Sequence, residues 1–264
     1  MDCGQVFGWD RDAGTYTGVI GERAVRLWQD DGMVCFVAEQ GLKARHIRRY
    51  LGLDEDLGKI LASIVRDAFM EKVVAQVRGL RLLKQEPWAC LCSYILSANN
   101  RVERIDSLVK EVSRKFGKRH VVRGRVVYSL PGPGIFSECT ESGMRSCGVG
   151  FRAPYLVRSA AMVAGGEVDL NAVGAMSYED ARGLLMTLPG VGGKIADCVL
   201  LFAFSMYDAF PVDVWIRRIM QQVYFASRET KPDDIRTFGR EYFGEYAGYA
   251  QEYIYYYARH HTKP

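Results

Sequence analysis

The stretch Leu188-Pro189-Gly190-Val191-Gly192-Gly193-Lys194 decides the fold. Before it, Ser177 and Asp180 make a capping-box-like start to a helix with one apolar face, and Pro189 ends that helix. After it, the run from Lys194 to Phe204 is apolar and predicts a second, buried helix. The glycines between the two helices allow only a tight turn. Residues 177–205 are therefore predicted to form a helix-hairpin-helix.

The glycines of this hairpin suggest a contact with phosphate. Gly190, Gly192 and Gly193 would let the backbone approach a phosphate closely, and the free N–H groups that begin the second helix favour an anion. Such a hairpin holds DNA without reading its sequence. The alternative is a plain helical hairpin in which the glycines only make the bend.

Two residues near the hairpin are candidate catalysts. Lys194 lies in the first turn of an apolar helix, where burial and the positive helix end disfavour its charged form and free the amine as a nucleophile. Asp213 follows Pro211 and precedes a helical pattern, so it is predicted to be an N-cap. Its carboxylate could also stabilise positive charge developing at a deoxyribose C1′. The alternatives are a surface lysine beside phosphate and an aspartate that only caps.

Composition places the chain in the ordinary globular class. It has 264 residues, of which 48% are hydrophobic and 25% charged, with no apolar run long enough for a membrane span and no signal sequence. We therefore expect an intracellular protein, and the predicted hairpin adds the expectation that it is located with DNA. The seven cysteines form no C-x-x-C pair and their number is odd, which favours neither disulfides nor zinc. We expect no metal and no cofactor.

The distribution of charge is more informative than the net charge of +4. Between Arg101 and Arg125 there are nine Lys or Arg residues and three Asp or Glu residues. A local excess of this kind is typical of a surface that follows phosphates, although a solvated face is the commoner explanation.

The hydrophobic period changes once along the chain. Alternating segments separated by turn-prone residues predict an antiparallel meander, with strands at Gln5–Trp9, Tyr16–Ile20, Ala24–Trp28 and Met33–Ala38. From about Gly41 the period is helical throughout. The predicted fold class is α+β, mostly α, with a sheet domain with short helices at 1–75 and helical domains at 76–264.

These residues together resemble the helix-hairpin-helix DNA glycosylases. Lys194 matches the Schiff-base lysine of the members that also cleave the sugar–phosphate chain. Endonuclease III shares the lysine but carries four C-terminal cysteines for an iron-sulfur cluster, and here no cysteine follows Cys198. The resemblance narrows to the 8-oxoguanine DNA glycosylase branch through segments that span most of the chain: Gly4-Gln5-x-Phe7-x-Trp9, Leu82–Pro87, Ser97–Asn100, Gly148–Ala153, Lys194–Cys198 and Tyr246–Gln251. It implies a TATA-binding-protein-like sheet domain plus helical domains.

The resemblance also implies which residues bind the damaged base. Gly4 would accept a hydrogen bond from N7–H of 8-oxoguanine through its carbonyl, since undamaged guanine lacks that donor. Gln251 would read the Watson–Crick edge, and Cys198 and Tyr255 would sandwich the purine. The alternatives are a strand-start glycine, a surface glutamine and simple core packing.

A second implied group contacts the DNA around the vacated position. Asn99, Arg104 and Arg152 would contact the cytosine left behind, and Phe151 would wedge into the gap; the alternative is ordinary helix-end and surface residues. The chain departs from the family at Trp215, where the family has a histidine that contacts phosphate. It also has Phe151 where tyrosine is usual and Tyr255 where phenylalanine is usual, but both keep an aromatic face.

The resemblance, together with the predicted hairpin, Lys194 and Asp213, implies a base excision repair enzyme. We expect a monomeric bifunctional glycosylase and abasic-site lyase that removes 8-oxoguanine opposite cytosine from double-stranded DNA by base flipping, attack of Lys194 on C1′, a Schiff base and β-elimination. Two alternatives stay open at this stage. One is the same chemistry on another oxidised base, and the other is a non-catalytic helix-hairpin-helix module that only holds DNA.

Overall fold

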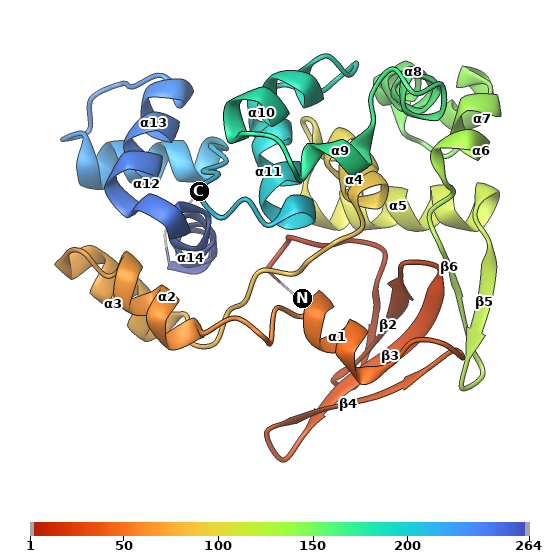
Figure 1. Cartoon of the computed structure of the whole chain (residues 1–264), viewed down its shortest axis with the longest axis horizontal. Helices are drawn as coiled ribbons and strands as arrows, with labels where there is room; N and C mark the ends of the chain where they lie inside the picture. Colours follow the sequence, from red (N-terminus) through yellow and green to blue (C-terminus); the bar gives the residue numbers. More distant parts are fainter. Residues whose placement is uncertain (1–2, 262–264) are drawn as a thin grey trace.

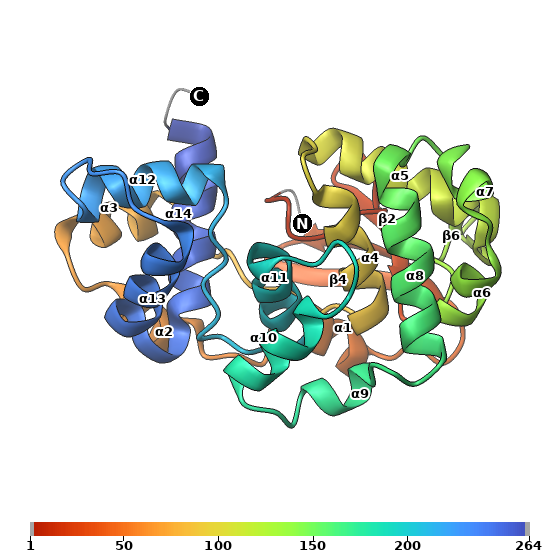
Figure 2. The same cartoon turned by 90° about the horizontal axis from the view of Figure 1, so that it is seen from above.

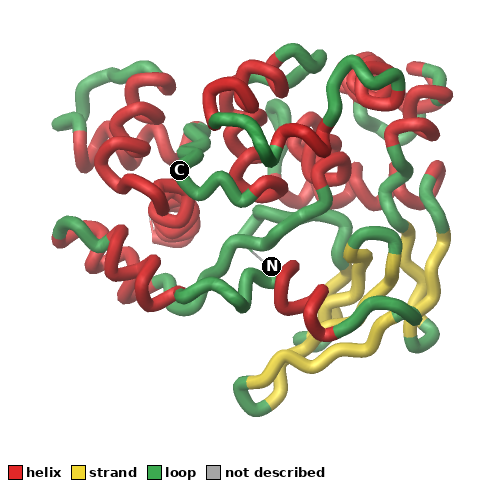
Figure 3. Tube along the Cα trace, in the orientation of Figure 1, coloured by secondary structure: helices red, strands yellow, loops and turns green. Residues whose placement is uncertain are grey.

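A four-stranded antiparallel sheet occupies one corner of the molecule, and most of the remainder is helical (Figures 1 and 3). This computed structural model describes residues 3–261. The elements in chain order are β1 (Asp10–Asp12), β2 (Thr15–Ile20), β3 (Arg23–Asp30), β4 (Met33–Ala38), α1 (Ala44–Tyr50), α2 (Leu57–Ile64), α3 (Ala68–Gln76), α4 (Pro87–Ser97), α5 (Val102–Phe116), β5 (Arg119–Val122), β6 (Arg125–Tyr128), α6 (Pro133–Glu138), α7 (Glu141–Arg145), η1 (Gly150–Arg152), α8 (Ala153–Ala164), α9 (Leu170–Val173), α10 (Tyr178–Met186), α11 (Gly193–Phe204), α12 (Val214–Tyr224), α13 (Pro232–Phe243), η2 (Gly244–Tyr246) and α14 (Ala247–His261).

The sheet is a meander in the order β1-β2-β3-β4. Tight turns join the strands, and Gly14, Gly21 and Gly32 adopt positive φ in them, a conformation that glycine reaches without strain. The strands expected at 16–20, 24–28 and 33–38 are confirmed, and Leu27 pairs with Phe36 in the register of β3 and β4. The predicted fold class, mostly helical with a small antiparallel sheet, is confirmed.

The strand predicted at Gln5–Trp9 is wrong. The structure has an irregular segment there, and β1 begins only at Asp10, inside the predicted turn. The reason is that side chains of the helical body bind this backbone. The Gly8 N–H donates to Asp106 Oδ1 at 2.8 Å, and the Gln85 amide donates to the Gln5 carbonyl at 2.6 Å. The segment therefore crosses from the sheet to the helices.

A second hairpin, β5–β6, interrupts the region predicted to be entirely helical. Arg123 and Gly124 both have positive φ, which gives a two-residue turn compatible with the twist of paired strands. Val122 and Val127 pack on Ala24 of β3, so the hairpin is an extension of the small apolar layer beneath the sheet. The sequence signal was weak because this hairpin has only four residues in each strand.

The helix-hairpin-helix is confirmed. Ser177 caps α10 by accepting a hydrogen bond from the Asp180 N–H, and α11 begins at Gly193 and is almost entirely buried. In Figure 2, α12, α13 and α14 form one group of helices with α2 and α3, and α4 to α9 form another, with α10 and α11 between them. Within residues 3–261, no helix is long and apolar enough to span a membrane.

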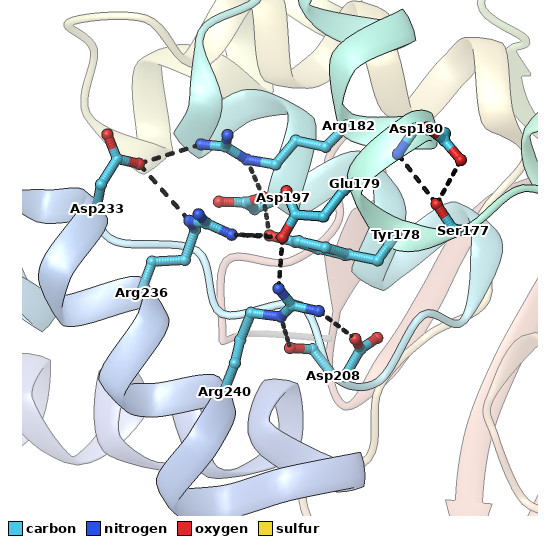
Figure 4. Close-up of polar contacts among 10 residues, drawn as sticks. All are labelled: Ser177, Tyr178, Glu179, Asp180, Arg182, Asp197, Asp208, Asp233, Arg236 and Arg240. Atoms are coloured by element: carbon cyan, nitrogen blue, oxygen red, sulfur yellow. Dashed lines mark hydrogen bonds and ion pairs between the residues drawn. The ribbon is translucent and has the colours of Figure 1, made fainter.

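A buried polar network fixes the back of the hairpin (Figure 4). Asp197 of α11 is 2% exposed, and its Oδ1 accepts hydrogen bonds from the Tyr178 hydroxyl at 2.6 Å and from Arg182 Nε at 2.9 Å. Arg236 of α13 donates to the same Tyr178 hydroxyl at 3.2 Å, and the Arg240 guanidinium lies 3.6 Å from the Tyr178 ring centroid. These contacts join the hairpin to α13 and orient α11.

Candidate active site

The front of α11 lines a small cavity of about 50 Å³. Four helical regions and the N-terminal segment contribute its walls: Gly4, Tyr94, Lys194, Cys198, Phe202, Pro211, Asp213, Gln251, Glu252 and Tyr255. The cavity therefore brings together all six residues that the sequence suggested for catalysis and base binding. Tyr94, Phe202, Pro211 and Glu252 complete it and were not predicted.

Lys194 is half-buried in the first turn of α11. Its Nζ lies 5.0 Å from the centroid of the Tyr94 ring, within the range of a cation–π contact. Tyr94 stacks in turn on Phe202, with ring centroids 5.7 Å apart and an interplanar angle of 6°. The aromatic pair thus orients the amine at the cavity wall. Tyr94 gave no sequence signal because an apolar helix such as α4 normally supplies core.

Asp213 is the N-cap of α12, as predicted, and its Oδ1 accepts a hydrogen bond from the Ile216 N–H at 2.8 Å. Burial raises the pKa of the Asp213 carboxyl, and the hydrogen bond from Ile216 and the positive charge of Lys194 act in the opposite direction. The cap therefore fixes a carboxyl group at the same cavity as the amine. Capping and an electrostatic role are compatible in this geometry.

The opposite wall belongs to α14. Gln251 is 5% exposed, and its Oε1 has no hydrogen-bond partner among the described residues. A buried carbonyl oxygen without a partner is costly, which is typical of a group that pairs with a ligand. Tyr255 is half-buried one turn further along α14.

Gly4 and Cys198 complete this part of the cavity. Gly4 has φ of +93°, and a Cβ placed there would lie 3.1 Å from the Arg259 guanidinium and 3.7 Å from the Tyr255 hydroxyl, so a larger residue would crowd α14. Cys198 is 4% exposed, and burial raises the pKa of its thiol to about 12. The thiol is therefore neutral and offers an apolar, polarisable surface.

The residues predicted to contact the opposite strand form a separate cluster at the end of α4. Asn99 and Arg104 are exposed, and Phe151 is 50% exposed, as a wedge requires. For Arg152 the alternative of an ordinary surface residue is wrong, because its side chain is buried, with 7% exposure. Its guanidinium donates to the carbonyls of Ala98, Asn99 and Val149 and lies 4.3 Å from the Phe151 ring centroid.

The three hairpin glycines differ in why glycine is needed. Gly190 has φ of +80°, and a Cβ there would come within 2.6 Å of the Tyr155 ring. A Cβ at Gly193 would collide with the Arg182 guanidinium, which the buried network holds. Gly192 is exposed and a Cβ there would meet nothing within 4 Å. Gly192 is thus the position where a phosphate could approach the backbone.

The charge excess at Arg101–Arg125 is distributed over α5 and the β5–β6 hairpin, and part of it is neutralised. Lys110 pairs with Asp10 at 2.8 Å and with Asp106 at 2.9 Å, and Arg125 pairs with Asp12. A larger cavity of about 680 Å³ lies between the sheet and the helices, but neither Lys194 nor Asp213 lines it.

Comparison with known proteins agrees with this geometry. A family of 8-oxoguanine DNA glycosylase N-terminal domains matches residues 1–91, and the HhH-GPD superfamily of base excision DNA repair proteins matches residues 92–245. The N-glycosylase/DNA lyase of Saccharomyces cerevisiae is 32% identical over 253 residues, which cover 85% of this chain and 67% of the yeast protein.

Solved structures give the same result for the fold. The 8-oxoguanine glycosylase/lyase of Clostridium acetobutylicum, in complex with double-stranded DNA containing cytosine opposite 8-oxoguanine, is 35% identical with a TM-score of 0.92 and covers 98% of this chain and 90% of its own. MBOgg1, in complex with a low affinity DNA ligand, is 32% identical to this chain, with a TM-score of 0.94. The match covers 99% of this chain and 91% of MBOgg1.

The helix-hairpin-helix with a lysine and an aspartate at one cavity defines a base excision DNA repair enzyme of the HhH-GPD superfamily. Within that superfamily, the chain belongs to the 8-oxoguanine DNA glycosylase family. It is an N-glycosylase and abasic-site lyase.

Proposed function

We propose that this enzyme removes 8-oxoguanine from double-stranded DNA, with Lys194 as the nucleophile. The Lys194 amine attacks C1′ of the extruded nucleotide, the bond from C1′ to the base breaks, and the base leaves with that electron pair. The nitrogen then loses a proton and the C1′–O4′ bond breaks, which opens the sugar to a Schiff base with a free 4′-hydroxyl. This Schiff base permits β-elimination of the 3′ phosphate. Asp213 stabilises the positive charge that develops at the sugar, because its carboxyl group lines the same cavity.

We propose that the cavity wall opposite Lys194 recognises the base. The Gly4 carbonyl accepts from N7–H of the oxidised purine, and the unpaired Gln251 Oε1 accepts from the Watson–Crick edge. Cys198 and Tyr255 contact the two faces of the ring. The unpaired Gln251 oxygen in a cavity shared with Lys194 is the observation that carries this proposal.

The DNA around the flipped nucleotide contacts the separate cluster. Phe151 enters the gap in the stack, and Asn99, Arg104 and Arg152 contact the cytosine opposite. Because the Arg152 guanidinium is already bonded to backbone carbonyls, its contact with cytosine requires that some of these bonds be exchanged. Gly190, Gly192 and Gly193 place the start of α11 near a phosphate.

Four further properties complete the proposal: the partner, the oligomeric state, the location and the extent of the sheet domain. The partner is duplex DNA containing an oxidised base, as in the complex of the Clostridium acetobutylicum relative. We propose that the enzyme acts as a monomer, inside the cell and on DNA, and that its sheet domain ends near residue 75.

The test is excision from a panel of duplexes that differ only in the damaged base. We expect release of 8-oxoguanine opposite cytosine, with little release of oxidised pyrimidines and none of undamaged guanine. If an oxidised pyrimidine were released faster than 8-oxoguanine, the proposed substrate would be wrong. Duplex binding without release of any base would reduce the protein to a holding module.

A further inference from the structure

Glu252 is a buried acid in the base cavity that the mechanism above does not use. It follows Gln251 on α14, is 3% exposed and lines the cavity together with Lys194 and Asp213. Its Oε1 has no hydrogen-bond partner among the residues that the structure describes. Two neighbouring side chains on one wall thus each present a buried oxygen atom that no described residue pairs with. A fold gains nothing from such atoms, so a ligand is the natural partner for both.

The surroundings of Glu252 favour its neutral form. Burial does so most strongly, whereas a hydrogen bond between the Cys3 thiol and the carboxyl group acts against it by lowering the pKa of Glu252. Gln5 Nε2 donates to the Cys3 sulfur at 2.9 Å. Asp213 faces it from the start of α12 and disfavours a second negative charge, whereas Arg259 acts in the opposite direction. Burial has the largest effect and raises the pKa of Glu252 to about 8. Near neutral pH the group is therefore mostly protonated.

We propose that Glu252 is a further base-recognition residue that donates a hydrogen bond from its neutral carboxyl group to a carbonyl oxygen of the flipped base. This inference rests on the proposed function of the cavity. A carboxylate at this position would repel a carbonyl oxygen, whereas a carboxylic acid supplies a donor. The bond strengthens as the base gains negative charge during cleavage of its link to C1′, so it favours the transition state over bound substrate.

The test is the pH dependence of base excision relative to cleavage of a preformed abasic site, both measured in single turnover. The ratio of the two rates isolates Glu252, because both reactions use Lys194 and Asp213 but only excision has a base in the cavity. In the wild type the ratio is expected to be constant below about pH 7 and to fall about tenfold per pH unit well above pH 8, as the donor proton is lost.

Two variants and a control sharpen the test. Glu252→Gln retains an N–H donor that does not titrate, so its ratio stays within a few-fold of the wild type near neutral pH and no longer falls at alkaline pH. Glu252→Ala removes the donor and lowers the ratio by about 5- to 150-fold at pH 7. Glu245→Gln, a change at an exposed acid beside the same helix, leaves the profile unchanged.

Failure of this proposal is distinct from failure of the proposed function. A wild-type enzyme that releases 8-oxoguanine with a ratio independent of pH from 6 to 9.5 would overturn the role of Glu252 alone. The same conclusion would follow from an alkaline fall that persists in Glu252→Gln. A wild-type enzyme that releases no oxidised purine at any pH would overturn the proposed function itself.

Discussion

The two sides of α11 contain buried carboxyl groups in opposite situations. Behind the helix, Asp197 is 2% exposed and receives hydrogen bonds from Tyr178 and Arg182. In front of it, across the cavity, Glu252 is 3% exposed, and one of its oxygens has no hydrogen-bond partner within residues 3–261. The two side chains are buried to nearly the same extent, but they differ in whether their oxygen atoms have hydrogen-bond partners. A paired buried charge fixes the fold, whereas an unpaired polar group beside a cavity marks the position of a ligand.

Removal of the paired carboxyl group, Asp197, should have the largest effect and tests whether this group fixes the fold. Asp197→Ala leaves the Arg182 guanidinium and the Tyr178 hydroxyl without their shared acceptor, and we expect a loss of about 3–5 kcal/mol in the free energy of unfolding. Urea denaturation measures it. An unchanged midpoint with an unchanged slope would show that the network does not hold the hairpin.

Asp213 belongs to both kinds of position, since it caps α12 and lines the cavity. Asp213→Asn keeps a capping oxygen but removes the charge. We expect excision to fall by about 10²–10³, which corresponds to about 2.7–4 kcal/mol of transition-state stabilisation. The melting temperature should change little. A lower melting temperature with unchanged turnover would assign Asp213 to the cap alone.

A substitution at Gln251 tests the cavity side of α11, where buried oxygen atoms lack partners among the described residues. Gln251→Ala removes the acceptor and leaves polar atoms of the bound base unpaired, which costs about 1–3 kcal/mol and lowers excision about 5- to 150-fold. Cleavage of an abasic site should survive, because no base is present there. Equal loss of both reactions would mean that Gln251 supports the fold instead.

The buried acid Glu252 also makes stability depend on pH. The folded protein holds the Glu252 proton more tightly than the unfolded chain does, because the pKa rises from 4.5 to about 8 on folding. Stability from this group is therefore greatest at low pH and declines as the pH rises between these two values. The melting temperature of Glu252→Gln should therefore rise relative to that of the wild type as the pH increases from 5 to 8. A difference in melting temperature between the variant and the wild type that does not change with pH would argue against a buried, protonated Glu252.

The sequence predicted the local patterns and missed the contacts between distant segments. The hairpin and the cap at Asp213 follow from glycines, a proline and helical periodicity within a few residues. The Gln5–Trp9 segment alternates like a strand, but side chains far along the chain bind its backbone. Tyr94 and Glu252 had no local signature, since only the packing of α4 and α14 around α11 brings them to the cavity. The domain boundary at residue 75 stays a prediction.

The central claim is that Lys194 bonds covalently to the sugar, and borohydride trapping tests it most directly. Reduction during turnover of a duplex containing 8-oxoguanine should yield a stable enzyme–DNA adduct with the wild type and with the control variant Lys59→Ala. The Lys59 side chain is 85% exposed and does not line the cavity. Lys194→Ala should give no adduct and no strand cleavage while still binding the duplex. An undiminished adduct in Lys194→Ala would contradict the account.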